Sequence, residues 1–283
     1  MPRRRRGKGK VSLVGAGPGD PGLLTLKGLL RLREADVVIY DRLVSKEVIA
    51  LIPHGVVKTY GGKDPGSKGR EKQDELNDLI LSEAKSGKKV VRLKGGDPFL
   101  FSRGGEEAEF LRRHRVEFEV VPGVSSALAV PAYAGIPLTH RGYASSVTVV
   151  TGREAGMKSK LDWSKIAGGS DVLVVLMGAA KVEEISTKLL EAGKPADTPL
   201  AAITWGTTAR QRTVTTTLSR AAKGEGGVDK VEAPCVIVVG RVVALAPRLR
   251  WLAEGGPSAL GAASGSPESR RGSSTPRSRL PRT

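Results

Sequence analysis

The sequence predicts an α/β protein with two domains, and three observations lead to this expectation. Short apolar runs that suit buried strands alternate with amphipathic segments that suit helices, as in parallel sheets covered by helices. This alternation ends near residue 121, where a segment rich in proline and glycine begins. It starts again at residue 146, without an internal repeat. We therefore expect an N-terminal domain with a parallel sheet over residues 10–122, then a connector and a C-terminal α/β domain over residues 123–247.

In the first domain, the apolar runs predict five strands and the pattern between them predicts four helices. Thr25 stands where a helix N-cap is expected. The strands are expected at residues 10–16, 36–41, 56–60, 90–94 and 118–121. The helices are expected at residues 25–35, 46–52, 76–84 and 106–113.

After residue 122 the pattern predicts one short helix in the connector, capped by Ser125 or Ser126, and then a second set of strands. These strands are expected at residues 146–151, 171–177, 199–204, 211–217 and 235–243, with helices at residues 181–192 and 218–223.

The positive charge is concentrated at the two ends of the chain. The net charge is +17, of which residues 1–10 carry +6 and residues 264–283 carry +4. Both ends are rich in Arg, Ser, Pro and Gly and have no apolar period, which is typical of disordered tails. We expect a disordered tail over 1–9 and an extension over 248–283 that is disordered from about 255. Nucleic-acid binding by these tails is the alternative interpretation.

The composition excludes several classes of protein. An apolar content of 39% is too high for a disordered chain. The single cysteine, Cys235, excludes an intrachain disulfide and a thiolate metal cluster, and it fits a cytoplasmic protein. The longest weakly polar run, residues 127–138, is shorter than the ~20 residues of a membrane span. The three histidines have no metal-like spacing, so no metal site is expected.

Three glycine-rich segments each follow an expected strand: Gly15–Asp20 (GAGPGD), Leu93–Phe99 (LKGGDPF) and Val121–Ala127 (VPGVSSA). The carboxyl ends of parallel strands are where ligands usually bind in α/β proteins. The first segment resembles a dinucleotide-binding turn, with Asp41 about 20 residues further on. However, Asp20 stands where the third glycine belongs, and its charge disfavours a pyrophosphate there.

Other nucleotide and hydrolase signatures are missing from the sequence. It has no Walker A motif and no nucleophile elbow of the form G-x-S-x-G. Glu106 and Glu107 fall in the first turn of an expected helix, a favourable position for negative charge, and we expect them to be structural.

Taken together, these segments resemble the tetrapyrrole methylases, and the resemblance spans roughly residues 10–247. The matching segments, in the order of that family, are GAGPGDPGLLTLK (15–27), YDRLVS (40–45), VVRLKGGDPFLFSRGGEE (90–107), VVPGVSSA (120–127), AYAGIPLTHRG (132–142), DW (162–163), MG (177–178), GT (206–207) and PCVIVVGRVV (234–243). The resemblance implies two α/β domains with a cofactor cleft between them, and a homodimer.

The same resemblance implies roles for particular residues. It assigns Asp41 as proton acceptor and Lys63 as proton donor. It assigns the contacts with S-adenosylmethionine to Pro18, Gly95, Gly96, Asp97, Leu100, Ser125, Ser126, Met177 and Gly206. Residues for holding substrate carboxylates are Arg42, Arg103, His140 and Arg141.

The implied activity is methylation of uroporphyrinogen III at carbons 2 and 7, giving precorrin-2 for sirohaem or cobalamin biosynthesis. The alternatives within the fold are a later precorrin methyltransferase, a diphthine synthase and a ribosomal RNA methyltransferase. A module that binds acidic surfaces through its tails is the non-enzymatic alternative. Residues 11–263 carry a modest net charge of about +7, which disfavours nucleic acid as a partner.

Overall fold

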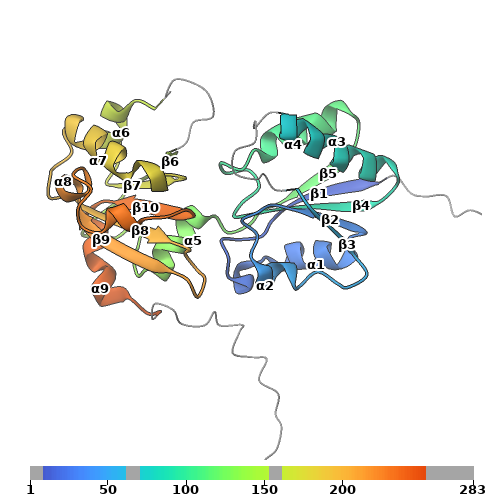
Figure 1. Cartoon of the computed structure of the whole chain (residues 1–283), viewed down its shortest axis with the longest axis horizontal. Helices are drawn as coiled ribbons and strands as arrows, with labels where there is room; N and C mark the ends of the chain where they lie inside the picture. The colour runs from blue at the N-terminus through green and yellow to red at the C-terminus, as the bar shows by residue number, and fades with distance from the viewer. Residues whose placement is uncertain (1–8, 62–70, 153–160, 253–283) are drawn as a thin grey trace, which may run out of the picture.

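The chain forms two α/β lobes, each built on a five-stranded sheet (Figure 1). This computed structural model describes residues 9–61, 71–152 and 161–252. The strands of the first sheet lie between residues 10 and 121, and those of the second lie between residues 147 and 239. The predicted fold class is confirmed. The expected tails lie almost entirely outside the described residues.

The first sheet is fully parallel, with strand order β3-β2-β4-β1-β5. Helices α1 and α2 cover one face of the sheet and helices α3 and α4 cover the other (Figure 1). The strands are β1 (Lys10–Gly15), β2 (Val37–Tyr40), β3 (Val57–Tyr60), β4 (Lys89–Lys94) and β5 (Glu117–Val121). The helices are α1 (Leu26–Glu34), α2 (Lys46–Ile49), α3 (Glu71–Lys85) and α4 (Gly104–Arg113).

The central strand β1 is buried on both faces, which explains its nearly continuous apolar sequence. Val14 packs with Leu32 of α1, while Leu13 packs on the opposite face with Ile80 of α3. The predicted cap is confirmed, because the Thr25 side chain accepts a hydrogen bond from the Gly28 backbone N–H at the start of α1. Two cores, one on each side of the sheet, therefore hold the first lobe together.

The second sheet is mixed, with order β6-β7-β10-β8-β9 and one parallel pair, β6 with β7. Its strands are β6 (Val147–Thr151), β7 (Val172–Leu176), β8 (Pro199–Thr204), β9 (Arg212–Thr217) and β10 (Cys235–Val239). Helices α5 (Ser126–Tyr133) and α9 (Ala246–Leu249) cover one face, and α6 (Trp163–Gly169), α7 (Val182–Glu191) and α8 (Leu218–Ala221) cover the other (Figure 1).

The structure corrects two expected elements and adds two helices. The strand expected over 235–243 ends at Val239, because Gly240 adopts φ +149° and residues 241–245 form a 3₁₀ turn. The helix expected from residue 76 begins at Glu71, since its first turn is polar and does not show in the apolar spacing. Helices α6 and α9 were not expected, because both are short and have weak apolar spacing.

Within the described ranges, no helix is both long enough and apolar enough to cross a bilayer. The longest described helix, α3, has 15 residues and carries charged side chains along its length.

Glu119 of β5 ties two neighbouring elements to its strand. Its carboxylate accepts hydrogen bonds from Ser12 of β1 at 2.9 Å and from Arg31 of α1 at 2.5 Å, and Lys27 of α1 lies 3.0 Å away. Burial alone would raise the pKa of Glu119, but the hydrogen bonds from Arg31, Lys27 and Ser12 outweigh it and lower the pKa to about 2. The charged form of Glu119 is therefore the form that the fold stabilises.

Replacing Glu119 with glutamine is expected to lower the free energy of unfolding at neutral pH by about 1–2 kcal/mol, because charged hydrogen bonds are lost at constant volume. A carboxylate with a depressed pKa contributes stability above its unfolded-state pKa, and the contribution is lost as pH falls through the folded-state pKa. The difference should therefore be complete above about pH 4.5 and shrink toward pH 2. Urea unfolding across this range measures it.

Glu117→Gln is the matched control, since Glu117 lies on the same strand with its side chain 67% exposed and 3.4 Å from Lys10. Exposed ion pairs contribute little, so this variant should unfold like the unmodified protein. A Glu119→Gln deficit that stays constant down to about pH 3 would contradict the electrostatic explanation.

Candidate active site

The loops that follow β1, β2, β4 and β5 meet at one edge of the first sheet, because all four strands are parallel. In the sheet register Gly15 lies beside Lys94, Tyr40 beside Leu93, and Val14 beside Val121. The glycine-rich segments predicted from the sequence therefore start next to one another. This edge faces the second lobe (Figure 1).

Backbone contacts between glycines join the three segments directly. Gly17 and Gly96 form an antiparallel bridge, with N···O distances of 3.2 and 2.7 Å. Asp97 then accepts a hydrogen bond at 3.1 Å from the backbone N–H of Gly123. A Cβ atom on Gly123 would lie 2.4 Å from the carbonyl oxygen of Gly96 and 2.7 Å from the Cα of Gly15. Only glycines permit this approach of the three loops.

One side of this junction is open enough to receive a ligand. Gly96 adopts φ +68°, and a Cβ built on it would meet only the backbone nitrogen of Ser126, at 3.8 Å. Ser126 is the first residue of α5, and Ser125 is its N-cap, with its hydroxyl accepting from the Ala127 N–H. The structure thus selects Ser125 as the cap, which the sequence left open between the two serines. Two other residues predicted to contact the cofactor lie in these loops. Pro18 directly follows Gly17 and is half-buried, and Leu100 is exposed.

The second lobe contributes two further predicted residues. Met177 directly follows β7, adopts a left-handed φ of +57° and exposes 48% of its surface. Gly206 follows β8 and is buried against α5, where a Cβ would lie 2.4 Å from a methyl group of Val130. Both residues stand at strand ends, like the glycine turns of the first lobe.

Hydrogen bonds from Asp20 connect the two lobes beside these turns. The backbone N–H of Asp20 donates to Thr207 at 3.2 Å, and its carboxylate accepts from Tyr133 at 2.9 Å and from Gly22 at 2.7 Å. Gln211 accepts from the Thr207 N–H and donates to the Tyr133 carbonyl. Burial, followed by the hydrogen bond to Asp20, raises the pKa of Tyr133 to about 12, so Tyr133 remains a donor at neutral pH.

Asp41 lies at the edge of a buried ionic cluster. Arg92 of β4 forms an ion pair with one carboxylate oxygen of Asp41, and the Lys94 ammonium lies 3.9 Å from the other. Both cations also contact Glu107 of α4, at 3.3 Å from Arg92 and 2.9 Å from Lys94. The side chains of Arg92, Lys94 and Glu107 are at most 2% exposed, whereas that of Asp41 is 30% exposed. Asp41 is therefore the one carboxylate of the four-residue cluster that reaches the surface.

Sequence reasoning missed three members of this cluster. Arg92 and Lys94 stand two positions apart in β4 and so share the face of the sheet that α3 and α4 cover. A pair of basic residues at alternate positions of an otherwise apolar strand was the available signal. Glu107 was expected to be structural in the first turn of a helix. Both lie in that turn: Glu106 pairs with Arg103 through its exposed side chain, and Glu107 is buried in the cluster.

The remaining predicted residues lie apart from this junction or outside the described chain. Lys63 lies outside the described residues. Arg42, His140 and Arg141 are exposed, and in the described ranges no hydrogen bond or ion pair of their side chains reaches the glycine turns. Arg103 is also exposed and forms its ion pair with Glu106 at 2.6 Å.

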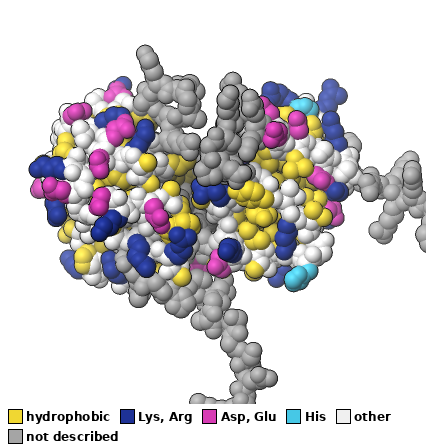
Figure 2. Space-filling view, viewed as in Figure 1, with side chains coloured by type: hydrophobic (Ala, Val, Ile, Leu, Met, Phe, Trp, Pro, Cys, Tyr) yellow, Lys and Arg dark blue, Asp and Glu magenta, His cyan; other side chains and the backbone are white. Residues whose placement is uncertain are grey.

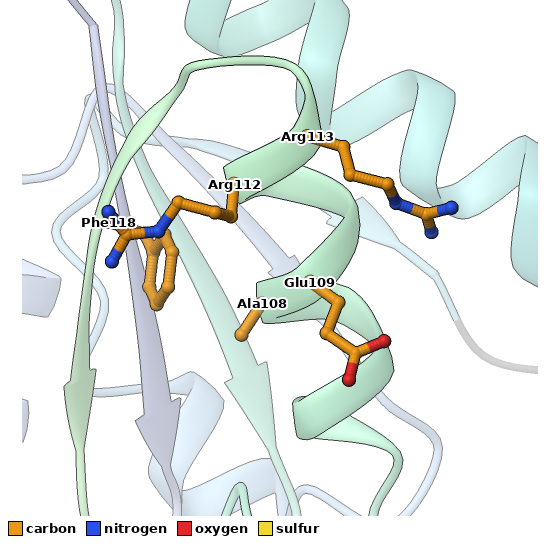
Figure 3. Close-up of a pocket in the computed structure, with 5 residues that line it drawn as sticks. All are labelled: Ala108, Glu109, Arg112, Arg113 and Phe118. Atoms are coloured by element: carbon orange, nitrogen blue, oxygen red, sulfur yellow. The ribbon is translucent and has the colours of Figure 1, made fainter.

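Charged and hydrophobic side chains lie on both sides of the boundary between the two lobes (Figure 2). A separate shallow hollow lies on the outer surface of α4 and β5, where the Arg112 guanidinium stands 5.6 Å from the centre of the Phe118 ring (Figure 3). Glu109 and Arg113 beside it point outward from α4, and none of the predicted site residues lines it. Among the described residues, no group of three or more His, Cys, Asp or Glu side chains is placed to hold a metal ion.

Comparison with solved structures shows the same architecture in known enzymes. A uroporphyrin-III C-methyltransferase from Thermus thermophilus, crystallised with S-adenosylhomocysteine, is 43% identical to this chain, with a TM-score of 0.74. The match covers 84% of this chain and all of that one. A cobalt precorrin-4 methyltransferase is 27% identical, with a TM-score of 0.72, over 83% of this chain and 95% of that one.

Sequence comparison gives longer relatives. Siroheme synthase of Actinobacillus pleuropneumoniae serotype 7 is 49% identical over 243 residues, which are 86% of this chain and 49% of that protein. Siroheme synthase of Neisseria meningitidis serogroup A is 46% identical over 246 residues, or 87% of this chain and 50% of that protein. The chain thus spans about half the length of the curated relatives it matches. The model of the tetrapyrrole (corrin/porphyrin) methylases matches residues 10–222. With that match and these identities, the chain belongs to the tetrapyrrole methylase family.

Proposed function

We propose that this protein transfers methyl groups from S-adenosylmethionine to carbons 2 and 7 of uroporphyrinogen III, producing precorrin-2 for sirohaem or cobalamin synthesis. The observation that carries the proposal is the junction of three glycine turns beside Asp41, within a fold that matches the full length of the Thermus enzyme. The likeness to siroheme synthases over the same residues supports the same substrate.

The residues of the junction fit S-adenosylmethionine. The open side of Gly96 leaves room for a ligand against the main chain, and the backbone nitrogen of Ser126 at the start of α5 lies nearest to that space. Asp97 is already held by Gly123 and by the Phe99 N–H at 2.8 Å, so it keeps the turn in shape. We propose that Pro18, Gly95, Gly96, Asp97, Leu100, Ser125, Ser126, Met177 and Gly206 hold the cofactor.

The methyl donor and the protein contribute different parts of the proposed reaction. S-adenosylmethionine supplies a methyl group on a positively charged sulfur, so the protein does not have to create a strong electrophile. The two lobes fix the distance between cofactor and ring carbon, and such positioning contributes up to roughly 7–11 kcal/mol in favourable cases. The exposed edge of the Asp41 carboxylate accepts the proton that the ring loses after methylation. Lys63 is the proposed proton donor.

The substrate carries eight carboxylates, and exposed cations suit their recognition. Arg42, Arg103, His140 and Arg141 are the proposed contacts, and all four are exposed. We also propose a cytoplasmic homodimer, with domains at residues 10–122 and 123–247.

The direct test of the proposal is anaerobic incubation with S-adenosylmethionine and enzymatically prepared uroporphyrinogen III, followed by mass spectrometry of the product. A gain of two methyl groups is expected. A gain of only one would point to a neighbouring precorrin reaction. Binding of S-adenosylhomocysteine without any methylation would contradict the substrate, and salt-dependent RNA binding would then favour an RNA methyltransferase.

Replacing Asp41 with asparagine is expected to lower kcat by about 10²–10⁴-fold, because the amide cannot accept the ring proton. The affinity for S-adenosylhomocysteine should stay within about twofold, as Asp41 is not part of the glycine junction. Single-turnover methyl transfer and calorimetric titration measure the two quantities. Asp78→Asn, on an exposed position of α3, is the control and should retain full activity. An unchanged kcat in the Asp41 variant would remove Asp41 from the mechanism.

Replacing Gly96 with alanine is expected to weaken S-adenosylhomocysteine binding by about tenfold or more, since the added methyl group strains the left-handed backbone and enters the open side of the turn. Gly193→Ala is the matched control, because Gly193 also has a positive φ, +86°, but its Cβ would meet no atom within 4 Å. Calorimetric titration of both variants separates backbone strain from lost space. Equal affinities in the two variants would contradict a cofactor site at Gly96.

A further inference from the structure

Glu107 is a fully buried carboxylate with two cations and no access to solvent. One of its oxygens accepts from Lys94 at 2.9 Å, from Arg92 at 3.3 Å and from Gln73 of α3 at 3.3 Å. The other oxygen, Oε2, is buried and has no hydrogen-bond partner among the residues that the structure describes. The contacts of Glu107 in the described chain therefore converge on one oxygen, and two of the three come from cations.

The charges of the cluster balance only when all four residues are counted. Arg92 and Lys94 face Asp41 and Glu107, which gives two positive and two negative groups. Burial lowers the pKa of Lys94, and the nearby Arg92 lowers it further, whereas Glu107 and Asp41 oppose this. Arg92 is also penalised by burial, yet the charges of Asp41 and Glu107 raise its pKa. Each cation therefore depends on both carboxylates for its charge.

The geometry gives the two carboxylates different positions. Glu107 holds Arg92 and Lys94 from the interior side, under α4, while the same two cations reach opposite oxygens of Asp41 at the surface edge. Arg92 is also held by the Ile39 carbonyl at 3.4 Å, two residues before Asp41. The Asp41 carboxylate thus pairs with Arg92 at one oxygen and lies 3.9 Å from the Lys94 ammonium at the other, and Glu107 acts on it only through these two cations.

We propose that Glu107 is a positioning residue for methyl transfer, which acts through Arg92 and Lys94 to hold the Asp41 carboxylate in place at the edge of the first sheet. The inference rests on the proposed function, because Asp41 is its proton acceptor. Glu107 itself does not touch the substrate or the cofactor. Loss of its charge leaves two cations on Asp41 alone, which redistributes their contacts and moves the carboxylate. A misplacement of this kind, of about 1 Å, costs on the order of 100-fold in rate.

Three variants separate the charge of Glu107 from its volume. Glu107→Gln keeps the volume and removes the charge, and it should lower kcat by about tenfold or more while S-adenosylhomocysteine affinity stays within about twofold. Glu107→Asp keeps the charge and shortens the side chain, and it should retain more activity than the glutamine variant. Glu109→Gln, on an exposed position of the same helix, is the control and should behave like the unmodified protein.

The decisive measurement is a double-substitution cycle on single-turnover methyl transfer, which radiolabelled methyl groups make sensitive to slow variants. If Glu107 acts through Asp41, then Glu107→Gln should have little further effect in the Asp41→Asn protein, because residues that act as one unit are not additive. A full additional loss in that background overturns the proposal. A glutamine variant as active as the aspartate variant, or more so, also overturns it, since volume would then matter more than charge.

Folding and function are separated within the same set of experiments. Circular dichroism and thermal unfolding are measured on every variant. If the Glu107 variants do not fold, the positioning role is overturned and Glu107 has a structural role. If the unmodified protein does not methylate uroporphyrinogen III, the proposed function fails and the inference fails with it. If the unmodified protein is active but the effects of Glu107→Gln and Asp41→Asn on the rate add, the inference fails and the proposed function stands.

Discussion

The parallel pairing of β1 with β4 is the constraint on which the candidate site depends. It places Gly15 beside Lys94, so the loops that leave these two strands run side by side, and Gly17 and Gly96 form a bridge immediately afterwards. β5 adds Gly123 on the other side of β1, close enough that a Cβ on Gly15 or on Gly123 would collide with the backbone of a neighbouring loop. The glycines therefore result from the sheet topology, and the space at Gly96 is what remains after the loops have packed.

A second constraint is the cost of burying charge. Removing four ionised groups from water is unfavourable unless each group is paired with an opposite charge. Loss of one partner of a pair leaves an uncompensated ion in the interior. The chain accepts this cost beneath Asp41, although an apolar side chain would fill the same face of β4 without it. Buried ion pairs are weak contributors to net stability, so stability alone does not explain the cluster. Fixing the direction of a surface carboxylate does explain it, because two cations with fixed positions define where that carboxylate lies.

Much of the fold was predictable because its strands are buried and its turns are marked by glycine and proline. All ten described strands coincide with expected runs, and the glycine segments were expected at the edge where they lie. The end of β10 was not predictable from apolar content, since Val242 and Val243 are equally buried in a 3₁₀ turn. The ionic cluster was not predictable either. Its members come from the end of β2, from β4, and from α4 at least 13 residues beyond β4's members, and charge in a sequence does not reveal whether a side chain is buried.

Asp20 shows how a departure from a known motif becomes informative once the fold is seen. In the sequence it argued against a pyrophosphate, because its charge occupies the place of a dinucleotide-binding glycine. In the structure the same carboxylate is only 4% exposed and accepts the Tyr133 hydroxyl, while its backbone donates to Thr207. Tyr133 belongs to α5 and Thr207 follows β8, so the first glycine turn is bonded to two elements of the second lobe. A site assembled from both lobes keeps its dimensions only if the lobes keep their spacing. The aspartate that excludes one class of ligand thus helps to hold the two halves of the cleft at a fixed separation.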